Sequence, residues 1–227
     1  MGEGNRLILW GGGTTRTMRP HWAMHELRLG YEHHLIGSRS GATEDAEFRE
    51  RLNPKGKIPV LEDGDFVLTE SAAIVTHLAD CHGEASGLTP PVGTRERARY
   101  NEWCFYVAME LDAHTLYIVR KHRDLAEIYG EAPIAVEEAF AGFDRQIMAA
   151  EAKLGDGRSY LLGETFTGAD ILLTTCLDWQ TFYDRPLPPW LAAYRGRIRT
   201  RPAYQSATAL NYSILPDGTL RQGPPSL

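Results

Sequence analysis

The sequence predicts an α/β domain over residues 1–83 and an all-helical domain over residues 94–227. Short apolar runs alternate with amphipathic stretches up to about residue 84, and beyond it the apolar residues recur at helical spacing. Residues 84–93 are rich in Gly and Pro, so we expect a linker there. A chain of 227 residues is long enough for two domains of this size.

The first domain is expected to contain the elements β-α-β-α-β-β-α in that order. Its first strand is the apolar run Arg6–Trp10, which three glycines close. A helix is expected from about Arg16 to Leu29. Because Pro20 is tolerated in the first turn of a helix and disfavoured in its interior, we expect the regular helix to begin nearer Met18.

A hairpin is the clearest signal in the second half of this domain. The apolar runs Ile58–Leu61 and Phe66–Leu68 flank Asp63-Gly64, a pair typical of tight turns between strands. Before the hairpin we expect a strand over Tyr31–Ile36 and a short, charged helix over Glu44–Leu52. Together with the helix that follows, these elements complete the predicted order.

The remaining elements are helices. Ser71 is expected to cap the last helix of the first domain. The helices expected in the second domain lie around residues 100–118, 136–154, 168–183 and 190–198 and after Pro202. The third of these is apolar on nearly every face, so it should be buried centrally. The tail from Pro216 contains Gly, Pro and Ser and should be loosely held.

Composition and charge limit the possible partners. Hydrophobic residues make up 43% of the chain and charged residues 24%, both close to the averages of soluble globular proteins. A net charge of −6 argues against binding to nucleic acid or to an anionic membrane surface. The longest apolar runs are too short to cross a bilayer. We therefore expect no nucleic-acid partner and no membrane partner.

Cysteines and histidines give two further expectations. Cys81, Cys104 and Cys176 are odd in number and form no CxxC pair, which favours a reducing compartment. Since the N-terminus also lacks the pattern of a secretory signal, we expect the protein to be cytoplasmic. His21 and His25 lie four residues apart without an evident third ligand, so no metal is expected.

Two segments of the first domain suggest binding sites, one for an extended peptide and one for an anion. A cis bond before Pro59 would expose the backbone N–H and C=O of Ile58 to an added strand, although an edge-strand proline is the simpler interpretation of this segment alone. At Glu70-Ser71, a helix start and a hydroxyl can hold an anion, a role compatible with plain N-capping. The occurrence of both segments around one DG turn favours binding.

Three stretches of the chain resemble the soluble glutathione transferase family. They are RLILWGGGTTRTMRPHWAMHELRLGYE at 6–32, NPKGKIPVLEDG and LTESAAIVTHLAD within 53–80, and LLGETFTGADILL at 161–173. The resemblance covers nearly the whole chain. It implies a thioredoxin-like N-terminal domain, an all-helical C-terminal domain and a homodimer with two active sites, with glutathione as co-substrate.

The resemblance also implies which residues hold glutathione. Backbone groups of Ile58 beside a cis Pro59 would pair with the peptide, and Glu70 and Ser71 would hold its γ-glutamyl end. Lys57 lies where several classes of the family use a side chain to reach the glycyl carboxylate or the neighbouring backbone. A solvated lysine beside a strand is an equally good interpretation of Lys57.

The loop after the first strand departs from the family pattern. The thiolate of glutathione is its nucleophilic form, and a hydroxyl that donates to the sulfur favours it. The family has Ser, Tyr or Cys in this loop, whereas this chain has Gly13-Thr14-Thr15-Arg16-Thr17. We expect Thr14 to be the donor, with Thr15 second and Arg16 third, and we expect Thr17 to cap the following helix. Without a cysteine here, mixed-disulfide chemistry is disfavoured.

The second substrate is expected to bind on the helical domain. Trp103, Tyr106 and Trp179 could line an apolar pocket there, although core packing is the simpler interpretation of each. The leading function is conjugation of glutathione to small apolar electrophiles, a detoxification reaction. The alternatives are a glutathione-dependent lyase, isomerase or dehalogenase, and a glutathione-binding ligand carrier with little turnover.

Overall fold

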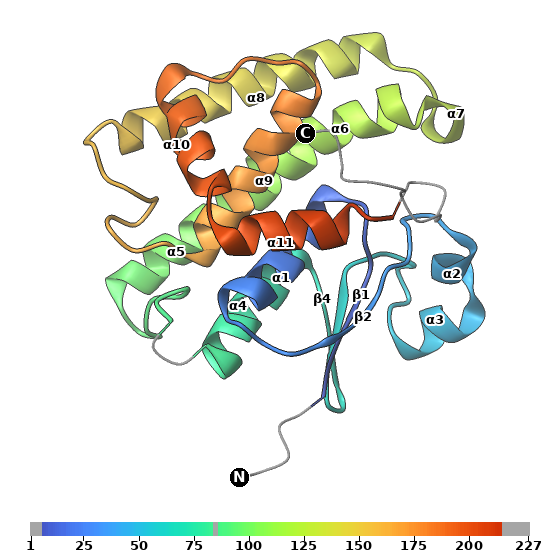
Figure 1. Cartoon of the computed structure of the whole chain (residues 1–227). Helices are drawn as coiled ribbons and strands as arrows, with labels where there is room; N and C mark the ends of the chain where they lie inside the picture. The colour runs from blue at the N-terminus through green and yellow to red at the C-terminus, as the bar shows by residue number, and fades with distance from the viewer. Residues whose placement is uncertain (1–5, 84–85, 215–227) are drawn as a thin grey trace. The chain divides into compact units, whose positions relative to one another are not determined.

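The computed structural model describes residues 6–83 and 86–214, which form two compact units (Figure 1). The first unit contains the N-terminal part up to Ser86 and the segment from Arg199 onward, and the second is Gly87–Ile198. Residues 84 and 85 of the expected linker and the expected loose tail from Pro216 lie outside the described residues. The domain boundaries at residues 83 and 94 stay predictions.

The first unit is built on a four-stranded sheet with the order β2-β1-β3-β4. Strand β1 (Leu7–Trp10) pairs in parallel with β2 (Glu32–His34) and antiparallel with β3 (Val60–Asp63). Strand β4 (Phe66–Thr69) pairs antiparallel with β3, with Asp63 opposite Phe66. The turn therefore contains two residues, Gly64 and Asp65, so the predicted hairpin is confirmed, whereas Asp63 of the DG pair lies in β3 and not in the turn.

Helices cover both faces of this sheet. On one face, Phe48 within α3 (Ala46–Arg51) and Leu52 just after it pack with buried Val60 and with partly buried Trp10. The preceding short helix is α2 (Gly41–Glu44). On the other face, α4 (Ser71–His82) packs on β3 and β4 and against α1 (Thr15–Glu26). Because side chains alternate along a strand, β3 directs Leu61 and Asp63 to the face that α4 covers.

Two features of α1 differ from expectation. The helix begins at Thr15, and Pro20 lies in its interior, so the expected start nearer Met18 is wrong. The bonds that cap the helix at Thr14 and Thr17 fix its start independently of the proline. In addition, α11 (Pro202–Asn211), which the sequence places in the helical domain, packs along α1 within the first unit (Figure 1).

The second unit is entirely helical in its regular structure. Its first long helix runs as α5 (Arg95–Tyr106), a π-helical segment Val107–Leu116 (η1), α6 (Tyr117–Val119) and a second π-helical segment Arg120–Asp124 (η2). The other helices are α7 (Ala126–Tyr129), α8 (Pro133–Leu154), α9 (Gly168–Phe182) and α10 (Pro189–Arg199). Helix α9 is buried along most of its length, as its uniformly apolar sequence predicts.

A buried carboxylate fixes the start of α9. Asp170 accepts hydrogen bonds from the backbone N–H groups of Leu161 and Thr167 and from the hydroxyl of Tyr194. Burial raises the pKa values of both Asp170 and Tyr194.

Among the described residues, no helix combines the length and the apolar composition that crossing a bilayer requires.

Candidate functional site

The loop after β1 is held in place by backbone hydrogen bonds. Gly11 donates to the carbonyl of His34 at 2.8 Å, and Gly13 donates to the carbonyl of Asn211 at 2.7 Å. Gly11 has φ +116°, and a Cβ atom on it would lie only 2.7 Å from Cβ of Ile58. Glycine is therefore required here. This close approach brings the loop next to Ile58, whose backbone the family resemblance assigns to glutathione binding.

A buried histidine supports the same loop. His21 on α1 is fully buried, and its Nε2 donates to the carbonyl of Gly11 at 3.0 Å. Since a carbonyl can only accept, Nδ1 carries no proton, and the hydroxyl of Tyr31 donates to it at 2.8 Å. Burial lowers the pKa of His21 to about 4, so the imidazole is neutral at physiological pH. The histidine thus ties the loop to α1.

Thr14 begins α1 as its N-cap residue. Its hydroxyl accepts the N–H of Thr17 at 3.1 Å, and the hydroxyl of Thr17 accepts the N–H of Thr14 at 3.1 Å. The side-chain amide of Asn211 donates to the carbonyl of Thr14 at 3.1 Å. The expectation that Thr17 caps the helix is therefore wrong in its assignment, because the N-cap is Thr14 and Thr17 is its partner three residues on.

The hydroxyl of Thr14 can combine its capping role with the predicted one. As a cap it accepts the N–H of Thr17, and its Oγ1 atom also lies 3.0 Å from Oγ1 of Thr17, so donation to a ligand requires its proton to turn away from Thr17. Thr15 and Arg16 are the first two residues of α1, and the side chains of both are partly buried. The first turn of α1 contains no acidic residue, so no carboxylate neutralises the partial positive charge of the helix dipole at this end.

The segment before β3 has the form that peptide binding needs. The Ile58–Pro59 bond is cis, Pro59 is buried and Ile58 is half-buried. Asn53 shapes the approach to it, because its side-chain amide donates to the carbonyl of Lys57 at 2.7 Å. The side chain of Lys57 is exposed.

The start of α4 brings two predicted residues together with two that sequence reasoning missed. Glu70 is the N-cap residue at φ +72°, without a side-chain capping bond, and Ser71 is the first helical residue. The expectation that Ser71 caps the helix is therefore wrong. Its hydroxyl oxygen instead accepts from Nη1 of buried Arg19 at 3.2 Å. Lys55 pairs with the exposed carboxylate of Glu70 at 2.5 Å.

The three aromatic residues assigned to the electrophile lie in the second unit. Trp103 and Trp179 are each only 6% exposed. The ring of Trp103 meets that of Tyr106 edge-on at 5.6 Å, and the indole of Trp179 donates to the hydroxyl of Tyr183. Tyr106 is partly exposed, and its hydroxyl donates to the carbonyl of Gln146. The pKa of Tyr106 is raised to about 12, mainly by burial and to a smaller extent by the negative charge of Glu110.

The first unit therefore has two helix starts that suit an anion, those of α1 and α4, and a backbone segment at Ile58 that suits an extended peptide. A polar group at Ser71 and the uncapped N–H groups of α4 suit a carboxylate. Donation by Thr14 together with the positive end of α1 suits a thiolate. Both are present in one small, extended peptide that carries a thiol between two acidic ends.

Comparison with known proteins agrees with this chemistry. Residues 5–80 match the model of the glutathione S-transferase N-terminal domain, and residues 133–197 match that of the C-terminal domain. A glutathione transferase from Methylococcus capsulatus is similar in structure, with 31% identity, a TM-score of 0.75 and coverage of 88% of this chain and 96% of that one.

Two further similarities concern a ligand and a reaction. The theta class glutathione S-transferase of Xanthomonas axonopodis, solved with glutathione bound, is 26% identical with a TM-score of 0.75, covering 89% of this chain and 97% of that one. The dichloromethane dehalogenase of Methylorubrum extorquens is 33% identical over 40% of this chain and 31% of its own length.

Proposed function

Because this chain belongs to the soluble glutathione transferase family and is a glutathione transferase, we propose that it joins glutathione to small apolar electrophiles, as a cytoplasmic homodimer. The observation that carries the proposal is the uncapped start of α4, where Ser71 follows Glu70. The α-carboxylate of the γ-glutamyl residue would accept from the Ser71 hydroxyl and from the first N–H groups of α4. Its ammonium group would meet the Glu70 carboxylate.

The rest of the peptide would follow the cis-proline segment. The backbone N–H and C=O of Ile58 would pair with the cysteinyl residue as an added strand, beside Pro59. Lys57 would reach the glycyl carboxylate, since its side chain is exposed. The close packing of Gly11 on Ile58 supports a cysteinyl thiol near the loop that leads to Thr14.

The reaction is a nucleophilic substitution by sulfur. Thr14 would donate a hydrogen bond to the thiolate, with Thr15 and Arg16 as the second and third candidates. The thiol proton leaves to solvent, the sulfur attacks the electrophilic carbon, a C–S bond forms, and the leaving group departs with the electron pair of its bond. Tyr106 is the most accessible of the three candidates for contact with the electrophile, since Trp103 and Trp179 are buried.

Location, assembly and role follow from the same proposal. All three cysteines lie in the described part of the chain and none is in a disulfide, which suits a reducing cytoplasm. Dimerisation is the arrangement that the family resemblance implies. Removal of reactive apolar compounds is the role that fits such a substrate class.

The proposal is tested by offering glutathione with several electrophiles to the purified protein. We expect thioether products from a chromogenic aryl halide or an epoxide, identified by mass spectrometry, and no product without glutathione. Dehalogenation, the second candidate, would give halide release from dichloromethane without a stable thioether. Calorimetric binding of glutathione with no turnover of any substrate would contradict the enzymatic proposal and favour a ligand carrier.

A further inference from the structure

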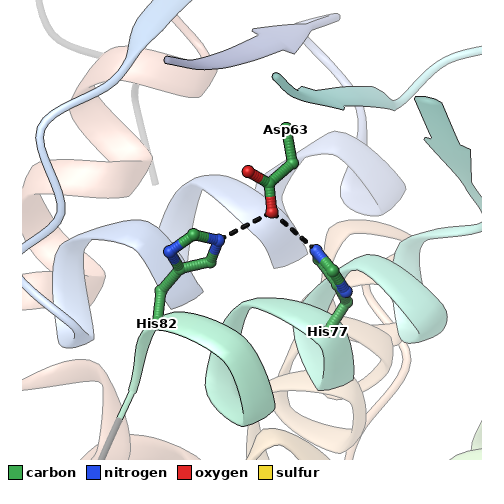
Figure 2. A group of neighbouring side chains, drawn as sticks. All are labelled: Asp63, His77 and His82. Atoms are coloured by element: carbon green, nitrogen blue, oxygen red, sulfur yellow. Dashed lines mark hydrogen bonds and ion pairs between the residues drawn. The ribbon is translucent and has the colours of Figure 1, made fainter. Parts of the chain in front are cut away.

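Three titratable side chains converge on one point between β3 and α4. Asp63 is the last residue of β3, and its Oδ2 atom lies 2.8 Å from Nε2 of His77 and 2.7 Å from Nε2 of His82. Figure 2 shows the carboxylate pointing toward α4, with one imidazole on each side of the same oxygen. None of these residues belongs to the predicted glutathione site.

The position of this cluster in the fold explains the convergence. Asp63 faces α4 because it follows Leu61 by two residues on the buried face of β3. The side chain of Asp63 is 7% exposed, whereas those of His77 and His82 are 21% and 23% exposed. The carboxylate is therefore nearly enclosed, while both imidazoles remain accessible to a small ion.

The distances suit a metal ion with only a small adjustment. The three ligand atoms, one from each residue, all lie within 4.8 Å of one another. Zinc bonds of about 2.0–2.1 Å in a tetrahedral site place neighbouring ligand atoms about 3.3 Å apart. The two O–N distances of 2.8 and 2.7 Å would thus open by about half an ångström. Rotations about the side-chain torsions of His77 and His82 are sufficient for that change.

Two neighbouring features favour a cation bound to imidazole. Cys81 Sγ lies 3.5 Å from Nδ1 of His77, so the thiol can hold the ring from the side opposite to Nε2. Metal-bound histidines commonly have such a partner on the second nitrogen, which fixes the tautomer and the ring orientation. His82 is the last residue of α4, where the negative end of the helix attracts positive charge.

We propose that Asp63, His77 and His82 form a binding site for a divalent transition-metal ion such as Zn²⁺. One carboxylate and two imidazoles form a donor set that suits zinc and related ions, and three protein ligands leave a fourth position for water. A bound ion would cross-link the β3–β4 hairpin to α4. No metal is expected from the sequence, since the one pair of histidines considered there, His21 and His25, has no evident third ligand. Asp63, His77 and His82 are 14 and 5 residues apart, a spacing that matches no metal motif.

The test uses Zn²⁺ alone as the probe, added to protein that has been stripped with a chelator. We expect calorimetry to give one Zn²⁺ per chain and a rise of the thermal midpoint with Zn²⁺ concentration. His77→Gln and His82→Gln should each lower the affinity at least about tenfold. His114→Gln is the matched control, because His114 is an exposed histidine 3.9 Å from a single carboxylate, that of Glu110.

Two readouts separate a metal site from a hydrogen-bonded bridge. Circular dichroism without metal checks that each variant is folded, and the visible spectrum of Co²⁺ bound to the wild-type chain reports four-coordinate nitrogen and oxygen ligation without any substitution. An affinity that neither His77→Gln nor His82→Gln changes would overturn the proposal. So would the absence of Zn²⁺ binding at millimolar concentration, since the three residues would then form only a structural bridge.

Discussion

The starts of α1 and α4, both in the first unit, are completed in opposite ways. At α1, Thr14 and Thr17 exchange hydrogen bonds between side chain and backbone, and Asn211 donates to the carbonyl of Thr14. At α4, the N-cap residue Glu70 has φ +72° and makes no side-chain capping bond. An L-residue in this conformation is strained, and such strain concentrates at sites that bind ligands.

We expect this difference to give the two helix starts different roles: the start of α1 positions the thiol, and the start of α4 binds the carboxylate. The polar groups at the start of α1 are largely satisfied by the chain itself, so this helix start can act on a ligand through its dipole and the one proton of the Thr14 hydroxyl. The first N–H groups of α4 lack a side-chain partner and are available to a carboxylate. We therefore expect changes at α4 to alter glutathione affinity and changes at α1 to alter the loop and the reactivity of the thiol.

The largest effect should be a loss of folding stability on acidification, caused by the buried His21 of α1. The pKa of His21 is lowered to about 4 from an ordinary value of 6.5, so between these pH values the unfolded state takes up a proton that the folded state excludes. This contribution to the free energy of unfolding is complete above pH 6.5 and is lost on acidification toward pH 4. The expected loss is about 3 kcal/mol.

Urea unfolding between pH 7 and pH 4 measures this loss. His21→Gln keeps a donor for the carbonyl of Gly11 and does not titrate, so its stability should fall less steeply over the same range. Its stability at pH 7 should be lower than that of the wild-type chain, because the imidazole fills a buried position. Identical pH profiles for the two proteins would show that another group causes the acid sensitivity.

The next largest effect should come from Ser71→Ala, on the α4 side. The change removes a donor to the γ-glutamyl carboxylate, a loss of about 1.5–3 kcal/mol, so glutathione affinity should fall about 10- to 150-fold in calorimetry. It also removes the acceptor of the bond from the buried guanidinium of Arg19, which should lower the free energy of unfolding by about 1.5–3 kcal/mol. Ser71→Thr, which keeps the hydroxyl, is the control. Unchanged affinity in a folded Ser71→Ala protein would remove Ser71 from the site.

Much of the first unit could be predicted because local patterns determine it. The apolar run before Gly11, the hairpin around Gly64 and the helix from Ser71 each carry their own signal, and the structure has all three. The start of α1 was misplaced because the interior position of Pro20 argued against the helix. The capping bonds of Thr14 outweighed that local cost.

The supporting residues of the candidate site could not be predicted in the same way. Arg19 reaches Ser71 across 52 residues, and Asn211 reaches Thr17 across 194, and neither pair has a fixed spacing. His21 appeared as half of an unsupported metal pair, whereas its actual partners are a backbone carbonyl and Tyr31. Such contacts depend on how helices pack on a sheet, which periodicity does not specify.

The smallest effect, a fall in the reactivity of the bound thiol, is expected from Thr14→Val. This variant is also the sharpest test of the different roles of the α1 and α4 starts. This change keeps the shape of the side chain and removes the hydroxyl proton, so the bound thiol should titrate at higher pH and kcat/KM should fall about tenfold, equivalent to about 1.4 kcal/mol. Loss of the cap should lower the free energy of unfolding by about 1 kcal/mol. Glutathione affinity below the pH at which the thiol ionises should stay unchanged, since binding belongs to the start of α4.

Ultraviolet absorbance of the thiolate against pH decides between the candidates in the loop. Thr14→Ser restores the hydroxyl and should restore the wild-type curve, whereas Thr15→Val should leave the curve in place. A shift caused only by Thr15→Val would move the donor one residue along α1. If neither valine variant shifts the curve, the sulfur is stabilised by Arg16 or by the backbone N–H groups of the first turn, and the start of α1 acts without a hydroxyl donor.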